Sequence, residues 1–324
     1  MQERKCWHPV LYENELANDP KSVRLCGELL VLWRDEKNEI HALKDLCIHR
    51  GTALSLGTVR GSDIVCPYHG WSFNGSGKCT FIPQLEDQQK IPEKARVMNY
   101  RCQTKFGLVW VALEEPLWDL PEVSELQDKT WLIANTGPFI WHANAARQVE
   151  NFTDFAHFPF VHPGLLGDPS RPLVPEHTVV ADDHILTYEV HRPEAKNTEE
   201  FPIFGNPSPE TPMRRNRYSL HLPYTIVLTI RWDNTPNKMI YFFTSQPVSE
   251  NECIGYCVVG KNYGEDDSET IKKFEEVIFD QDKRIVESQR PEQVPFDLAE
   301  ELHLKFDAVA LSYRRQMKKM GFGT

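Results

Sequence analysis

Long apolar runs are missing from this chain of 324 residues. The longest, Gly107 to Leu113 and Tyr224 to Ile230, are far shorter than the roughly 20 residues that a membrane-spanning helix needs. The first residues, Met-Gln-Glu-Arg-Lys-Cys-Trp-His-Pro, contain neither an apolar segment nor a small-residue cleavage site, so no secretory signal is visible. We therefore expect no association with a membrane and a cytoplasmic location.

Positive charge and nucleotide-binding motifs are also scarce. The chain has 36 lysine and arginine residues against 47 aspartate and glutamate residues, and its densest basic run is only Arg314 to Lys319. Nucleic-acid binding relies on clustered basic side chains, so no nucleic-acid partner is expected. A Gly-x-Gly-x-x-Gly motif does not occur, which indicates that any NADH or NADPH is oxidised by a separate protein.

Apolar and aromatic residues, 40% and 11% of the chain, are sufficient for two folded domains. The first third consists of short β-rich segments separated by Gly, Asn and Asp, such as Leu29 to Trp33, and this pattern predicts a small all-β domain. Pro116, Pro121 and several acidic residues then interrupt the apolar pattern. We place the boundary there, which gives domains of residues 1–115 and 116–324.

The second domain is predicted to be α+β. Strand-like runs come first along it, and two helical runs follow. The strand-like runs are Thr178 to Val180, Ile185 to Val190, Thr225 to Trp232, Met239 to Gln246 and Cys253 to Val259, and the helical runs are Ser268 to Gln289 and Phe306 to Met320. Between Arg192 and Pro223, five prolines and few apolar residues predict a long irregular loop of the kind that often forms a lid.

Two short segments of the first domain pair a cysteine with a histidine. Cys47-Ile-His49 is followed sixteen residues later by Cys66-Pro-Tyr-His69, and glycines flank both segments. The four side chains are predicted to converge from two adjacent loops on a metal. A structural zinc is the alternative, although zinc modules usually group like ligands together. The other cysteines have no such partners and are predicted to be buried, small apolar side chains; they are Cys6, Cys26, Cys79, Cys102, Cys253 and Cys257.

A second candidate site follows in the second domain. His157 and His162 are five residues apart, with Asp154 three residues before the first, so on a helix Asp154 and His157 would share a face. Pro159 cannot continue an unbroken helix, and the bend would let both histidines reach one point. A histidine and an aspartate among phenylalanines also fit an ordinary buried pair, so this segment alone does not decide the question.

Asp282 lies about 120 residues later on the inward face of a predicted helix. The apolar stripe of that helix runs through Ile271, Phe274, Ile278, Ile285 and Gln289, and Asp282 lies within it while Asp280 points away. A buried carboxylate is costly unless it is paired or bound to a metal. A salt bridge to a basic neighbour is the alternative reading.

These segments resemble the Rieske non-haem iron aromatic-ring-hydroxylating oxygenases, terminal oxygenase components that include vanillate O-demethylases, methylxanthine N-demethylases and saxitoxin-tailoring hydroxylases. Asn151 to Gly164 and Asp282 to Gln289 carry the match beside the two Cys/His segments. The resemblance implies an all-β Rieske domain and a catalytic domain of helix-grip type, an antiparallel sheet flanked by helices. It also implies a Rieske [2Fe-2S] cluster and a mononuclear Fe(II).

The resemblance assigns roles to single residues. Cys47 and Cys66 would hold one iron of the cluster, and His49 and His69 the other. His157, His162 and Asp282 would bind the mononuclear iron as a facial triad. Asp154 would bridge toward a Rieske histidine of the neighbouring subunit in a homotrimer. Candidates for the substrate pocket, each with core packing as the alternative, are Phe152, Phe158, Phe160, Phe242 and Phe243.

The implied function is an oxygenase, a monooxygenase, that hydroxylates or N- or O-demethylates a small cyclic substrate. Electrons from NAD(P)H would arrive only indirectly, through a separate reductase or ferredoxin, and dioxygen would be the oxidant. The alternatives are a Rieske electron-transfer protein without oxygenase chemistry, which would use the first site only, and a zinc-stabilised binding module.

Overall fold

The structure is a computed structural model that describes residues 2–17, 19–193, 213–265 and 267–322. The chain divides into two compact units, one formed by Glu3–Leu120 and the other by Pro121–Thr324 together with Met1–Gln2. Each unit is described by itself. Within the described part of the chain, no helix combines the length and the hydropathy that a bilayer span requires.

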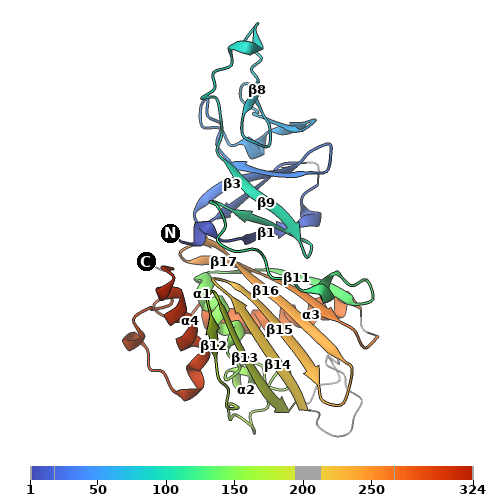
Figure 1. Cartoon of the computed structure of the whole chain (residues 1–324), viewed down its shortest axis with the longest axis vertical. Helices are drawn as coiled ribbons and strands as arrows, with labels where there is room; N and C mark the ends of the chain where they lie inside the picture. The colour runs from blue at the N-terminus through green and yellow to red at the C-terminus, as the bar shows by residue number, and fades with distance from the viewer. Residues whose placement is uncertain (1, 18, 194–212, 266, 323–324) are drawn as a thin grey trace. The chain divides into compact units, whose positions relative to one another are not determined.

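The N-terminal unit consists of two antiparallel sheets (Figure 1). A six-stranded sheet has the order β1 (His8–Tyr12), β10 (Leu108–Ala112), β9 (Asn99–Lys105), β4 (Ile40–Lys44), β3 (Glu28–Arg34) and β2 (Lys21–Leu25). A four-stranded sheet has the order β5 (Thr58–Arg60), β6 (Asp63–Val65), β7 (Ser72–Phe73) and β8 (Cys79–Phe81). The prediction of a small all-β domain is confirmed.

The sequence of strand β3 is continuously apolar from Leu29 to Trp33 and does not alternate with polar residues. Successive side chains of a strand point to opposite faces of the sheet. Leu30 and Leu32 enter one hydrophobic core of the unit, and Val31 and Trp33 enter the other. All four are fully buried, so both faces of this strand are covered by packed side chains.

The C-terminal unit is built on a seven-stranded antiparallel sheet. Its order is β11 (Leu132–Trp141), β17 (Glu252–Lys261), β16 (Lys238–Ser249), β15 (Thr225–Trp232), β14 (Met213–His221), β13 (Ile185–Pro193) and β12 (Val180–Asp182). Its helices are α1 (Ala145–Thr153), the single turn α2 (Phe158–Val161), α3 (Ser268–Val286) and α4 (Ala308–Lys319). The predicted α+β class, an antiparallel sheet flanked by helices, is confirmed.

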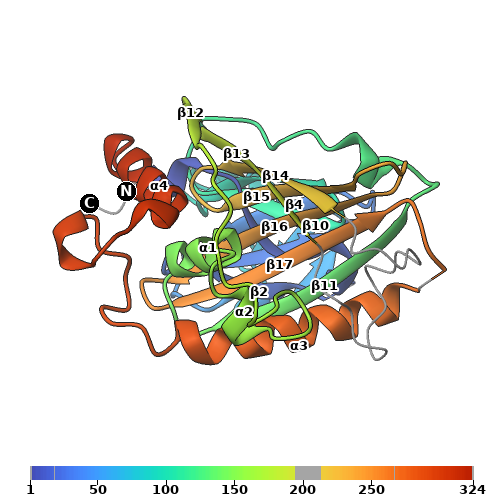
Figure 2. The ribbon, with the colours of Figure 1, turned by 90° about the horizontal axis from the view of Figure 1, so that it is seen from below.

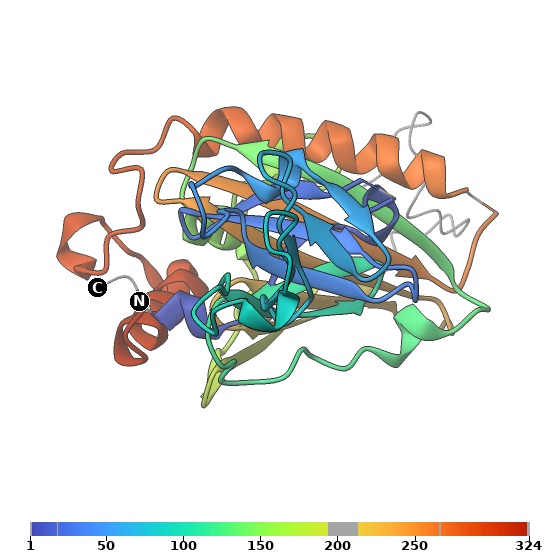
Figure 3. The same ribbon diagram turned by 90° about the horizontal axis from the view of Figure 1, so that it is seen from above.

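Helix α3 runs alongside β11 (Figures 2 and 3). Asp267 caps its first turn, because the carboxylate accepts a hydrogen bond of 2.8 Å from the amide of Thr270. Phe279 stacks on Phe139 of β11 at 3.9 Å between ring centroids, and α1 packs against both α3 and the sheet. The space between α1, α3 and the sheet is where the second candidate site lies.

Two features of this unit differ from the prediction. Residues 213–221, placed in an irregular loop, form strand β14, whose inward side chains Arg214 and Asn216 are polar and hide the apolar alternation. Helix α3 ends at Val286, so Gln289 lies beyond it, and Ile285 is exposed rather than part of the buried stripe. Residues 194–212, the rest of the predicted loop, lie outside the described residues.

Candidate metal centres

Two loops of the N-terminal unit present Cys47, His49, Cys66 and His69 from matching backbone turns. The amide of Gly51 donates to the carbonyl oxygen of Cys47 at 2.9 Å, and the amide of Gly70 donates to that of Cys66 at 3.0 Å. Both glycines have a positive φ, 74° and 73°, a conformation that L side chains rarely adopt. Each loop therefore holds one cysteine and one histidine in an equivalent turn.

The four side chains form a sulfur pair and a nitrogen pair. Cys47 and Cys66 are buried with their thiols in hydrogen-bond contact, and burial raises the pKa of the Cys47 thiol to about 11. The rings of His49 and His69 lie 4.4 Å apart between centroids, and the buried Nδ1 of His49 has no hydrogen-bond partner. Trp71 stacks on His49 at 4.4 Å. The donor set fits a Rieske cluster, in which two thiolates hold one iron and two imidazoles the other.

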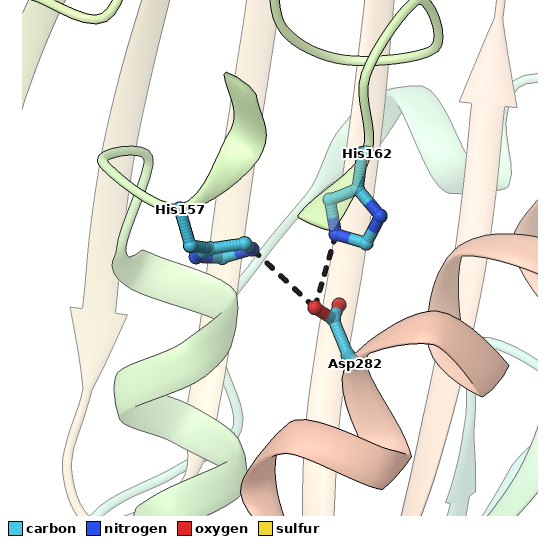
Figure 4. Close-up of side chains that lie close together, drawn as sticks. All are labelled: His157, His162 and Asp282. Carbon is cyan, nitrogen blue, oxygen red and sulfur yellow. Dashed lines mark ion pairs between the residues drawn. The ribbon is translucent and has the colours of Figure 1, made fainter. Parts of the chain in front are cut away.

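In the C-terminal unit, His157, His162 and Asp282 meet from separate elements (Figure 4). His157 precedes the short helix α2 and His162 follows it. Asp282 projects from the buried face of α3 and is only 6% exposed. The Nε2 atoms of His157 and His162 lie 3.4 Å and 3.0 Å from Oδ1 of Asp282.

The hydrogen bonds around these histidines turn their Nε2 atoms toward Asp282. Nδ1 of His157 donates to Oδ2 of Asp154 at 3.0 Å, and Nδ1 of His162 donates to Oε1 of Gln281 at 2.7 Å. The Nε2 atoms of both histidines are buried and make no hydrogen bond. Two imidazole nitrogens and a carboxylate oxygen gathered at one point fit a divalent metal with open coordination positions.

The carboxylate of Asp282 is held by a residue of helix α1. Nδ2 of Asn151, in α1, donates to Oδ1 of Asp282 at 3.1 Å. Metal ligands in proteins are oriented by contacts of this kind. Here an oxygen accepts the Nδ1 proton of each histidine, and an amide donates to the carboxylate.

The sequence interpretation placed Asp154 on a helix, but in the structure it lies outside one. Helix α1 ends at Thr153, and Asp154 follows it in an extended conformation. Its Oδ1 accepts the amide of Ala156 at 2.7 Å, which forms a tight turn that brings Oδ2 to His157. The predicted closeness of Asp154 and His157 is confirmed, although its cause is this turn rather than helical spacing.

A cavity that is partly open to solvent begins at His157 and Asp282. Phe152, Phe158 and Phe279 form apolar walls. Farther along α3 and β14, the polar residues Glu275, Asn216 and Arg214 line it. Apolar walls with a few polar groups at one end are typical of a site for a small organic molecule.

Two of the five phenylalanines proposed for a pocket, Phe152 and Phe158, line this cavity. Phe243 supports it from behind, because its ring stacks on Phe152 at 4.4 Å, but it is fully buried, as is Phe242. Phe160 is 69% exposed. Phe160, Phe242 and Phe243, which were predicted to line the pocket, therefore do not line it. Phe242 and Phe243 are core residues of the sheet, and Phe160 is on the surface.

Several residues of the site were not anticipated. Glu275 lies seven residues before Asp282, and helical periodicity could have found it because both share one face of α3. Asn216 could not be found, because a polar residue on a strand gives no sign of facing inward. Gln281 also carries no periodic signal, since it lies beside Asp282 rather than a helical turn away.

Comparisons with known proteins agree with this arrangement. Residues 6–99 match the Rieske [2Fe-2S] domain, and residues 141–321 match the vanillate O-demethylase oxygenase C-terminal domain. Methylxanthine N1-demethylase NdmA of Pseudomonas putida is 30% identical over 98% of this chain and 89% of its own length. Methylxanthine N3-demethylase NdmB of the same organism is 31% identical, with the same shares covered.

Solved structures show the same fold. The structure of Pseudomonas putida NdmA with caffeine superposes with a TM-score of 0.87 at 30% identity and covers 98% of this chain and 90% of that one. Dicamba monooxygenase bound to dicamba, at 22% identity, gives a TM-score of 0.84 and covers 98% and 97%.

A domain with paired Cys/His loops, followed by an antiparallel sheet whose helices gather two histidines and an aspartate, defines the oxygenase component of a Rieske non-haem iron system. The chain belongs to this family, in the group with the vanillate O-demethylase type of C-terminal domain. It is an oxidoreductase that uses dioxygen, and its cofactors are a Rieske [2Fe-2S] cluster and a mononuclear iron.

Proposed function

We propose that this chain hydroxylates or demethylates a small cyclic organic compound at a mononuclear iron held by His157, His162 and Asp282. The observation that carries the proposal is the geometry of these three residues, which meet at one point, with His157 and Asp282 lining a cavity. When bound there, the iron supplies dioxygen activation. The cluster would be held by Cys47, His49, Cys66 and His69.

The surrounding residues would bind and orient the substrate. Phe152, Phe158 and Phe279 offer aromatic surfaces to a flat ring and exclude water from the carbon that is oxidised. The balance of the reaction is one dioxygen, two electrons and two protons per oxygen atom inserted, with water as the second product. If the hydroxylated carbon is an N-methyl or O-methyl group, it leaves as formaldehyde.

We propose a functional division at the predicted boundary, with residues 1–115 receiving electrons and residues 116–324 using them. The electron donor would be a separate reductase or ferredoxin. Asp154 supports transfer between subunits of a homotrimer, because its carboxylate touches His157 and its side chain is still 48% exposed. We also propose a cytoplasmic location, where a reducing environment would keep the eight cysteines free of disulfides.

Iron content tests the proposal. The purified protein, reconstituted with ferrous iron and sulfide, is expected to hold about three irons per chain, and His157→Ala about two, with unchanged cluster absorbance. His142→Ala, which alters an exposed histidine of the same unit, is the control and should keep all three. Three irons in His157→Ala would refute the mononuclear site.

Oxygen uptake with a surrogate reductase, across N-methyl, O-methyl and unsubstituted ring compounds, would then assign the reaction. Formaldehyde among the products selects demethylation. The alternative function, electron transfer alone, predicts two irons in the wild-type chain and no oxygen uptake with any compound.

A further inference from the structure

The cavity is polar at the end away from the three metal-binding residues. Glu275 and Asp282 lie on the same face of α3, seven residues apart, a rise of about 10 Å along the helix. Between these levels the walls are the rings of Phe152 and Phe279. A molecule whose reacting carbon lies beside Asp282 would therefore meet Glu275 with its opposite edge.

Two buried oxygens at this end have no partner within the protein. Oε1 of Glu275 and Oδ1 of Asn216 make no hydrogen bond, although the residues are only 3% and 2% exposed. Both residues line the cavity. The other polar atoms of the two side chains are occupied, since Tyr241 hydrogen-bonds to the carboxyl group of Glu275 and Asn216 to the hydroxyl of Tyr218.

A buried acceptor without a partner costs about 1–3 kcal/mol, so a pair of them in one cavity points to a ligand that supplies the donors. Burial and the charge of Asp282 raise the pKa of Glu275 to about 8, so the carboxyl group is largely neutral at pH 7. A neutral acid and an amide suit an N–H or O–H group, and the buried guanidinium of Arg214 at the same end of the cavity disfavours an ammonium.

We propose that the substrate is a ring compound that carries an N–H or O–H donor on the edge opposite the oxidised carbon, and that Glu275 and Asn216 select it by accepting from that edge. The proposal rests on the proposed function, since the oxidised carbon is placed by the metal site. Recognition through a buried polar group strongly rejects an analogue that lacks the matching group.

Binding, rather than turnover, tests the proposal. The iron-loaded protein would be titrated by calorimetry with matched pairs in which one N–H is replaced by N–CH3: theobromine against caffeine, and 1-methyluracil against 1,3-dimethyluracil. We expect at least one N–H member to bind about tenfold or more tightly than its methylated partner. Glu275→Leu should remove most of this preference, whereas Glu275→Gln, which keeps both an acceptor and a donor, should retain it.

Glu276→Gln is the matched control, because Glu276 is the exposed neighbour on the same helix and should leave every affinity unchanged. Absence of binding by all N–H members, or equal binding of both members of each pair, would overturn the proposal. So would a preference that survives in Glu275→Leu and also in Asn216→Leu. Iron content is measured in the same samples, so a protein with about three irons and no preference refutes only this inference, while loss of the third iron refutes the proposed function.

Discussion

At His162, the group that accepts the Nδ1 proton is the amide oxygen of Gln281, whereas at His157 it is the carboxylate of Asp154. A carboxylate raises the basicity of an imidazole ligand more than an amide does. The two histidines therefore offer unequal donors to a metal, and the difference lies in residues outside the triad.

The contact of Gln281 predicts a measurable change in iron binding. Gln281→Leu removes the acceptor from His162, so the affinity for ferrous iron should fall about 10–100-fold, as measured by competition with a chelator. Gln281→Glu supplies a carboxylate and should lower the reduction potential of the mononuclear iron. Asp280→Asn alters the exposed neighbour and should change neither quantity. An unchanged affinity in Gln281→Leu would show that the contact does not orient the ligand.

Glu275 predicts a dependence of stability on pH. Its pKa rises from 4.5 to about 8 on folding because burial and Asp282 disfavour the charged form. The folded state thus holds the proton where the unfolded state has lost it, so this group lowers stability progressively as pH rises from about 4.5 to about 8, by up to a few kcal/mol. The melting temperatures of the wild type and Glu275→Gln should therefore diverge between pH 5 and 9, because the variant loses less stability as pH rises. Parallel curves would contradict the neutral form of Glu275.

At the scale of elements, α4 is joined to α1 by a buried ion pair. The guanidinium of Arg314 contacts both carboxylate oxygens of Glu150, at 2.6 and 2.7 Å, and also Glu301 at 2.7 Å. Glu150 precedes Asn151, which hydrogen-bonds to Asp282, so this pair fixes the part of α1 that supports the triad.

Arg314→Leu should destabilise the C-terminal unit by about 3–5 kcal/mol, because Glu150 would stay buried without its partner. The measurement is the melting temperature, together with the temperature at which iron is released. Arg315→Leu, on the exposed side of the same helix, should change both by little. The double variant Arg314→Leu, Glu150→Leu should recover part of the loss, and no recovery would show that packing rather than the buried charge explains the effect.

The elements also show what could be predicted from the sequence. Asp282 was found because helical periodicity marks a carboxylate on an apolar face, and the Cys/His loops because their spacing is local. Strand β11 was not anticipated, because Gly137 and Pro138 interrupt it; a bulge between Thr136 and Phe139 accommodates them. The polar end of the cavity depends on β14 packing opposite α3, a long-range contact without a local signal.

At the scale of the whole molecule, each unit has its own buried residues and its own candidate metal site. The cluster residues all belong to Glu3–Leu120, and the triad to Pro121–Thr324. Electrons must therefore pass from one unit to another, either within one chain or between neighbouring chains of the proposed trimer.

A subunit-mixing experiment distinguishes these routes. Cys47→Ser should lose the cluster and keep the triad, and His157→Ala the reverse, so each variant alone should be inactive. In a head-to-tail ring assembled from equal amounts of both, about a quarter of the junctions place an intact cluster before an intact triad, and oxygen uptake should return to about a quarter of the wild-type value. Asp154→Ala in the Cys47→Ser chain should reduce this recovery, because the bridging carboxylate belongs to the chain with the working triad. Transfer within one chain predicts no recovery at any mixing ratio, since no chain in the mixture would hold both sites.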